Sequence, residues 1–257
     1  MSARSLGWPI AVGFAFFAAW ELIVAALGTK PVVLPPPTLI ARVMWTRAPL
    51  IAEHMWPTFY EIVLGFLLSV VGGVLVAIVI TYSTIARKGF YPLIVVSQII
   101  PKVAVAPLLV VWFGLGGTSR LLLAFLIAFF PMVINTATGL TGVDDDLVRM
   151  ARAYMGGRWQ IFAKIRLPAA LPLVFGGMKI SITLAVIGVV VAEFVAAQRG
   201  IGYLIVMANG LLDTPLMMAA IVALSVMGLA LYGAIALIER LAIYWQPTSE
   251  PARGGFA

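Results

Sequence analysis

The chain has 257 residues, of which 63% are hydrophobic and only 11% are charged, and its mean hydropathy is +1.09. A soluble domain carries about 25% charged residues, so this composition excludes a water-soluble globule and predicts an all-α protein in a lipid bilayer. The absence of cysteine excludes disulfides and thiolate metal sites, and a single histidine leaves no histidine cluster for a metal.

The N-terminal region contains the first predicted span, at residues 8–27, which are apolar apart from Glu21. About 20 residues suffice to cross a bilayer, and the run is too long for a signal peptide, so we predict a retained span. A proline-rich stretch at residues 31–37 then predicts an extended connector, and a short amphipathic helix is expected at residues 39–45.

The second predicted span, at residues 62–86, contains no charge and is the clearest of all. Its glycines Gly65, Gly72 and Gly73 would allow neighbouring helices to approach closely.

The third predicted span, at residues 90–115, is interrupted. Pro101 and Pro107 lie inside the run with Lys102 between them, and broken helices at membrane depth persist only inside protein or beside water. A charge at mid-depth costs about 2.5–3.5 kcal/mol on insertion scales. This region therefore predicts either a translocation pathway or an ion pair, with a kinked structural span and a snorkelling lysine as the plainer interpretation. A fourth span is expected at residues 121–140.

A charged loop at residues 141–172 separates the fourth span from the fifth. Three acids at 144–146 are suited to capping a helix start, where unpaired N–H groups favour negative charge. We expect one short helix up to Met155, a turn at Gly156, and a second helix that Pro168 ends. The five basic residues of the loop are Arg149, Arg152, Arg158, Lys164 and Arg166.

The last third of the chain contains two further predicted spans, at residues 173–195 and 216–238. Glu193 lies near the end of the fifth span, and a glycine-rich connector with short apolar pieces follows it. We therefore predict that residues 1–257 form a single transmembrane domain of six spans.

The distribution of basic residues predicts the orientation. With the N- and C-termini in the cytoplasm, ten basic loop residues lie inside and five outside, which agrees with the excess of Lys and Arg in cytoplasmic loops. This orientation places residues 141–172 in the cytoplasm and accounts for the net charge of +7 without nucleic acid as a partner.

Several long runs of the sequence, in the same order, resemble the permease subunits of bacterial ABC importers, in the nitrate, sulfonate and taurine branch. The resemblance covers roughly residues 34–245, and the run around Lys102 looks closest to permeases for thiamine-precursor pyrimidines, riboflavin or aromatic acids. The runs that carry it are IIPKVAVAPLLVVWFGLGGTSR, FFPMVINTATGL, VVVAEF, RGIGYLI and IERLAIYW.

The charged loop resembles the motif by which such permeases dock their ATPases, Glu-Ala-Ala, then Gly, then Ile-x-Leu-Pro. Ala151, Arg158, Ile165, Leu167 and Pro168 match it in this sequence. The front half departs from the pattern: arginine stands in place of glutamate, methionine in place of alanine and of glycine, and the glycine lies one position later. These four departures are Arg149, Met150, Met155 and Gly156.

The resemblance implies a type I ABC importer permease fold with cytoplasmic coupling helices in the bacterial inner membrane. Its implied partners are a second copy of the chain, two cytoplasmic ATPase subunits, an external solute-binding protein and membrane lipid. No phosphate-binding loop is visible in the sequence, so we expect ATP to be bound by the partner subunits, with no cofactor, metal or catalytic site in this chain.

The expected solute is small and anionic or heteroaromatic. We expect Lys102 and Glu193 to lie near the pathway, where one or both contact the solute or the two pair with each other. A stand-alone secondary transporter is the leading alternative, but it predicts an inverted repeat and no long run recurs. A membrane enzyme would require a clustered catalytic set, which is not visible.

Overall fold

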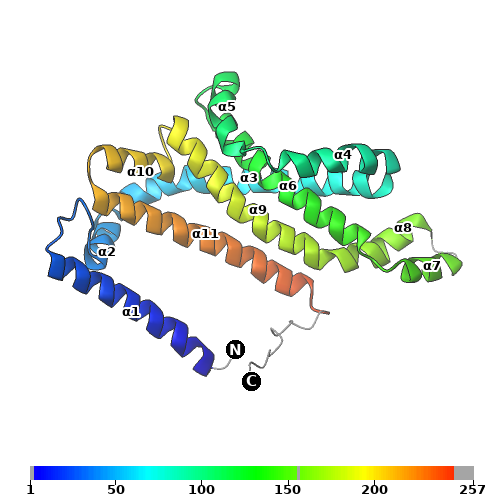
Figure 1. Cartoon of the computed structure of the whole chain (residues 1–257), viewed down its shortest axis with the longest axis horizontal. Helices are drawn as coiled ribbons and strands as arrows, with labels where there is room; N and C mark the ends of the chain where they lie inside the picture. The colour runs from blue at the N-terminus through cyan, green and yellow to red at the C-terminus, as the bar shows by residue number, and fades with distance from the viewer. Residues whose placement is uncertain (1–2, 155–156, 246–257) are drawn as a thin grey trace. The chain divides into compact units, whose positions relative to one another are not determined.

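The computed structural model describes residues 3–154 and 157–245, and every regular element in that part is helical (Figure 1). This agrees with a bilayer as solvent, because a helix satisfies its backbone hydrogen bonds within its own segment. The all-α fold class is therefore confirmed.

Within residues 3–154 and 157–245, five helices are long and apolar enough to cross a membrane. They are α1 (Ala3–Leu27), α3 (Ala48–Tyr82), α6 (Gly117–Thr141), α9 (Leu167–Ala196) and α11 (Thr214–Ala242). A sixth crossing is made if the broken third span, α4 (Thr84–Ser97) followed by η1 (Lys102–Val105) and α5 (Ala106–Phe113), counts as one span. Shorter helices connect them: α2 (Pro37–Thr46), α7 (Asp145–Ala153), α8 (Arg158–Ile161) with the π-helical turn η2 (Phe162–Arg166), and α10 (Ile201–Gly210).

Several boundaries differ from those expected from the sequence; α3, for example, begins at Ala48 and not at residue 62, and two further differences have a local cause. The second span ends at Tyr82, four residues earlier than expected, because the Ser83 hydroxyl accepts a hydrogen bond from the N–H of Ala86 and starts α4. The third span bends by 86° between α4 and η1, where Pro101 precedes the 3-10 turn and supplies no N–H to continue a helix. The predicted interruption is thus a sharp bend.

The chain divides into two compact units, Met1–Tyr60 with Val190–Met227, and Glu61–Val189 with Gly228–Ala257. The first unit has an apolar core that α2, α3, α10 and α11 supply, with Ile40, Ile51, Leu204 and Leu216 among its buried residues. The single-domain organisation expected from the sequence stays a prediction.

The second unit is built around α6, which contacts α3 and α9 at small residues. A Cβ added to Gly65 or Gly73 of α3 would lie 2.8 Å from the side chains of Ala124 or Met132 on α6. A Cβ on Gly188 of α9 would lie 2.8 Å from the Cα of Ala124. Glycine therefore lets both helices approach α6 closely, as expected for α3.

Replacement of Gly188 by alanine is expected to lower the thermal unfolding temperature of the detergent-solubilised protein. The added methyl group would meet backbone rather than a movable side chain, and overpacking of this kind costs about 1–3 kcal/mol. Gly176→Ala is the matched control, since Gly176 also lies on α9 and, apart from its chain neighbours and the backbone of its own helix, no atom lies within 4 Å of the position that a methyl group would take there. Equal unfolding temperatures for the two variants would contradict the close contact between α6 and α9.

Candidate functional site: the charged elbow and the Lys102 cavity

The charged loop folds as an elbow, residues 144–168, in which the short helix α7 and the run of α8 and η2 lie beyond the ends of α6 and α9 (Figure 1). Asp144 begins α7 as expected, with its carboxylate accepting a hydrogen bond of 2.8 Å from the N–H of Asp146. Val148 is buried, whereas Leu147 and Met150 are 42% and 54% exposed. One face of α7 is therefore packed, and its other face offers apolar side chains to solvent or to another protein.

The second half of the elbow is anchored to the second unit. Phe162 packs on Leu140 and Ala170, and its ring meets the ring of Tyr82 edge-on at 5.8 Å. The guanidinium of Arg166 lies over the Tyr82 ring, 5.9 Å from its centre. These contacts hold η2 against the bundle and leave α7 as the exposed part.

The prediction that Pro168 ends the second helix is wrong. Helical structure runs without a break from Arg158 to Ala196, through the π-helical turn η2 and into α9. The N–H of Leu167 donates to the Phe162 carbonyl across the π turn, and the missing N–H of Pro168 removes one hydrogen bond from this run without ending it.

The structure places most elbow residues predicted to contact an ATPase on this continuous element or on α7. Arg149 is exposed and forms a 3.6 Å ion pair with Asp146, and Ala151 lies in the last turn of α7. Arg158 begins α8, Ile165 lies in η2, and Leu167 and Pro168 open α9. Met155 and Gly156 lie outside the described residues.

Lys102 lies at the bend of the third span, beside a cavity of 320 Å³ in the second unit. Its ammonium nitrogen lies 4.7 Å from the centre of the Phe130 ring on α6. Within residues 3–154 and 157–245, no carboxylate forms an ion pair with it. The other cavity residues come from the bend, from α6 and from α9: Gln98, Ile100, Pro101, Val103, Ile127, Pro131, Leu184 and Ile187.

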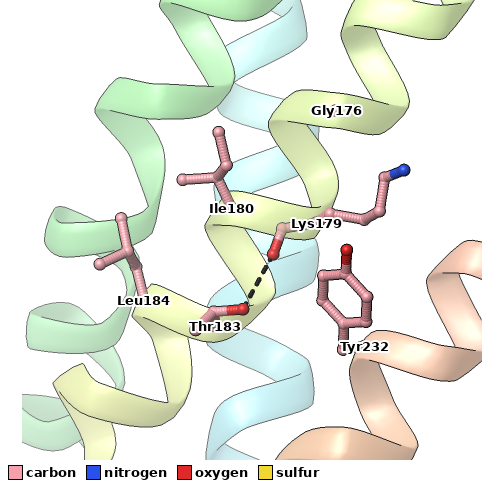
Figure 2. A pocket seen from close by; sticks show the side chains of 6 residues that line it. All are labelled: Gly176, Lys179, Ile180, Thr183, Leu184 and Tyr232. Carbon is pink, nitrogen blue, oxygen red and sulfur yellow. Dashed lines mark hydrogen bonds between the residues drawn. The ribbon is translucent and has the colours of Figure 1, made fainter. Parts of the chain in front are cut away.

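A second lysine within a spanning helix, Lys179, forms an ion pair. Its ammonium lies 2.7 Å from the Glu239 carboxylate, and it lines a second cavity of 380 Å³ between α9 and α11. Figure 2 shows the Tyr232 hydroxyl pointing toward the Lys179 side chain and the Thr183 hydroxyl bonded to the Lys179 carbonyl. The two lysines thus differ in whether a carboxylate compensates their charge.

Glu193 lies near the end of α9 in the first unit and is only 2% exposed. Its carboxylate accepts hydrogen bonds of 2.6 Å from the Thr58 hydroxyl and 2.6 Å from the N–H of Gly202 in the first turn of α10. A carboxylate at a helix N-terminus is favoured because the unpaired N–H groups carry partial positive charge. Glu193 is thus placed where it holds α10.

A cluster that we call the α10 clamp consists of Glu193 and two side chains of α3, His54 and Thr58. The N–H of Gly200 donates to Nδ1 of His54, and the N–H of Ile201 donates to the Thr58 hydroxyl. Gly200 has a φ of +120°, and a Cβ there would collide with the Glu193 carboxylate. The glycine in this turn is therefore required by the clamp.

A buried ion pair that no sequence pattern indicates joins α3 to α6. The Arg120 guanidinium donates to both carboxylate oxygens of Glu61, at 2.6 Å to Oε1 and 2.8 Å to Oε2. Both side chains are largely buried. The sequence shows only two opposite charges, each near the end of an apolar run. Since the two residues are 59 positions apart, no local pattern pairs them.

Taken together, several long apolar helices, a broken span and a charged elbow between spans define a polytopic membrane protein. Residues 69–243 match the model of the binding-protein-dependent transport system inner membrane component family, and the chain belongs to that family. It is accordingly a multi-pass inner-membrane protein and a permease subunit of an ABC importer for small solutes.

Several curated relatives are similar over nearly their whole length. The riboflavin transport system permease protein RibX of Chloroflexus aurantiacus is 36% identical over 244 residues, 94% of this chain and 91% of the relative. The formylaminopyrimidine transport permease protein ThiX of Halalkalibacterium halodurans is 31% identical, with 88% and 91% covered. The nitrate import permease protein NrtB of Synechococcus elongatus is 30% identical, with 88% and 86% covered.

A solved structure supports the fold. The inward-facing MetNI methionine ABC transporter contains a chain that matches with a TM-score of 0.54 at 21% identity, covering 78% of this chain and 97% of that one. The type I permease fold is thereby confirmed, while the solutes of these proteins differ from one another.

Removal of the Glu193 carboxylate is expected to loosen the first turn of α10. In Glu193→Ala, amide hydrogen exchange at residues 201–204 should become faster by about tenfold to a hundredfold, because hydrogen bonds to charged groups contribute about 1.5–3 kcal/mol. The measurement is exchange mass spectrometry on the protein in nanodiscs.

The matched control is Glu21→Ala, which removes a different helix-capping carboxylate. Glu21 accepts from the N–H and the hydroxyl of Thr38, at 3.2 and 2.7 Å, in the first turn of α2. Exchange should become faster in α2 and stay unchanged in α10. Unchanged exchange in α10 of the Glu193 variant would show that the clamp does not hold that helix.

Proposed function

We propose that this chain works as a homodimeric permease in which each copy carries one cytoplasmic ATPase subunit on its elbow. An external solute-binding protein would deliver the solute to the opposite face, with both termini in the cytoplasm. ATP would be bound by the partner subunits. The proposal rests on the family membership and on one observation, the exposed apolar face of α7 next to an anchored helix.

The continuous helix after the elbow supplies a physical route for force. Arg158 and Leu184 belong to the same uninterrupted helical run, so a displacement of the elbow is carried along α9 for roughly 40 Å at about 1.5 Å per residue. Leu184 and Ile187 on that helix line the Lys102 cavity. Closure of two ATPase subunits would therefore change the shape of this cavity, as in transporters that move one bundle against another around a midplane site.

The proposed solute is small and anionic or heteroaromatic, and its pathway passes Lys102. The support is the uncompensated charge of Lys102 among the described residues and the solutes in the names of the relatives, which include riboflavin, a formylaminopyrimidine and nitrate. For Glu193, the hydrogen bonds to α10 favour a positioning role over contact with solute.

A charge on the exposed face of α7 should uncouple the transporter. Met150→Glu is expected to reduce co-purification of the cognate ATPase subunits and solute import into proteoliposomes by at least about tenfold, since an unpaired charge buried in an interface costs several kcal/mol. The control is Tyr244→Glu, which places the same charge on an 83% exposed residue just after α11.

Two results would contradict the proposal. Equal losses in both variants would mean that the elbow has no special role. Solute import by the chain alone, driven by an ion gradient without ATPase subunits, would support a secondary transporter.

A further inference from the structure

The charges within the apolar helices of this protein differ in how they are compensated. Glu61 has Arg120, and Lys179 has Glu239. In the described part of the chain Lys102 forms no ion pair, and the face of the Phe130 ring is its charge-stabilising contact. An ammonium at membrane depth is unfavourable unless it meets water, an aromatic face or an anion. The Lys102 ammonium can therefore form an ion pair with a negatively charged group that comes from outside the chain.

The rest of the cavity is suited to a ring. Ile127, Leu184 and Ile187 supply aliphatic walls, Phe130 supplies an aromatic one, and Gln98 adds one amide that can donate or accept a hydrogen bond. A bare inorganic anion would lose its hydration on entry and gain nothing from apolar walls. A planar ring gains both burial and stacking, and a volume of 320 Å³ lies at the small end of the range for small-molecule sites.

Resting on the proposed function, we infer that the Lys102 cavity binds a planar aromatic or heteroaromatic solute that carries a negatively charged group. The anion lies against the Lys102 ammonium, and the ring packs on Phe130 and the aliphatic residues of α6 and α9. Lys102 and Phe130 are then the residues that determine specificity, and small anions such as nitrate are excluded as solutes of this chain.

The test is direct binding of three probes to the full-length permease in nanodiscs, measured by saturation-transfer NMR. Benzoate has both ring and charge, benzamide has the ring alone, and nitrate, followed as a competitor of benzoate, has the charge alone. Benzoate should bind saturably, benzamide should bind at least about tenfold more weakly because it lacks a charge-assisted contact, and nitrate should not compete.

The variants assign the binding to the cavity. Lys102→Gln should weaken benzoate binding by at least about tenfold, and Phe130→Leu by about two- to tenfold, the range expected for loss of an aromatic contact. Lys102→Arg keeps the charge and should retain binding. The control Lys179→Gln with Glu239→Gln removes the compensated pair of the neighbouring cavity and should leave benzoate affinity unchanged.

The inference is overturned if benzoate fails to bind, if nitrate competes with benzoate, or if Lys102→Gln binds benzoate as the parent does. None of these outcomes contradicts the proposed function as long as Met150→Glu loses ATPase association and import. Conversely, if Met150→Glu keeps ATPase association and import while benzoate still binds, the ATP-driven assembly is rejected and the binding site stands.

Discussion

Compensation of charge inside an apolar bundle is the constraint on which the arrangement of this permease depends. A lipid-facing helix offers no water to an ionised side chain, so each such group needs a partner from the protein or access to a wet cavity. Arg120 and Glu61 satisfy each other between α6 and α3, and Lys179 and Glu239 do so between α9 and α11. These pairs also fix which helix faces meet, because a shift of one residue would separate the charges.

The same constraint governs two glutamates on spanning helices that cap short connecting helices. Glu21 compensates its charge at the N-terminus of α2, and Glu193 does so at the N-terminus of α10 with the help of Thr58. In both cases a spanning helix holds a short connecting helix through backbone N–H groups. The connector after α9 is thereby an ordered element, although its sequence is rich in glycine.

Much of this architecture could be predicted from the sequence, because long apolar runs, proline-rich connectors and capping acids are local signals. The elbow, the helix at α2 and the close approach at Gly65 and Gly73 are of this kind. The family resemblance seen in the elbow is confirmed, while the role of its individual residues in docking ATPases stays a prediction.

What the sequence could not supply depends on contacts between distant residues or on backbone register. One partner of Glu193, Thr58, lies 135 positions away, and nothing local to VVVAEF indicates it. The direction of the bend at Pro101 depends on packing against α6, since proline specifies a break but no angle. Pro168 likewise predicts the end of a helix, because periodicity alone does not distinguish a terminated helix from one that continues through a π turn.

The π turn at Phe162–Arg166 fixes how the helical turn before it is oriented relative to α9. Each residue of an α-helix advances the direction of its side chains by about 100° around the axis, and a π turn contains about one residue more than an α turn. The length of this segment therefore sets the azimuth of α8 about the axis of α9. If the ATPase docks at the elbow as proposed, deletion of one residue from this segment would turn that part of the docking surface by about 100° about the axis.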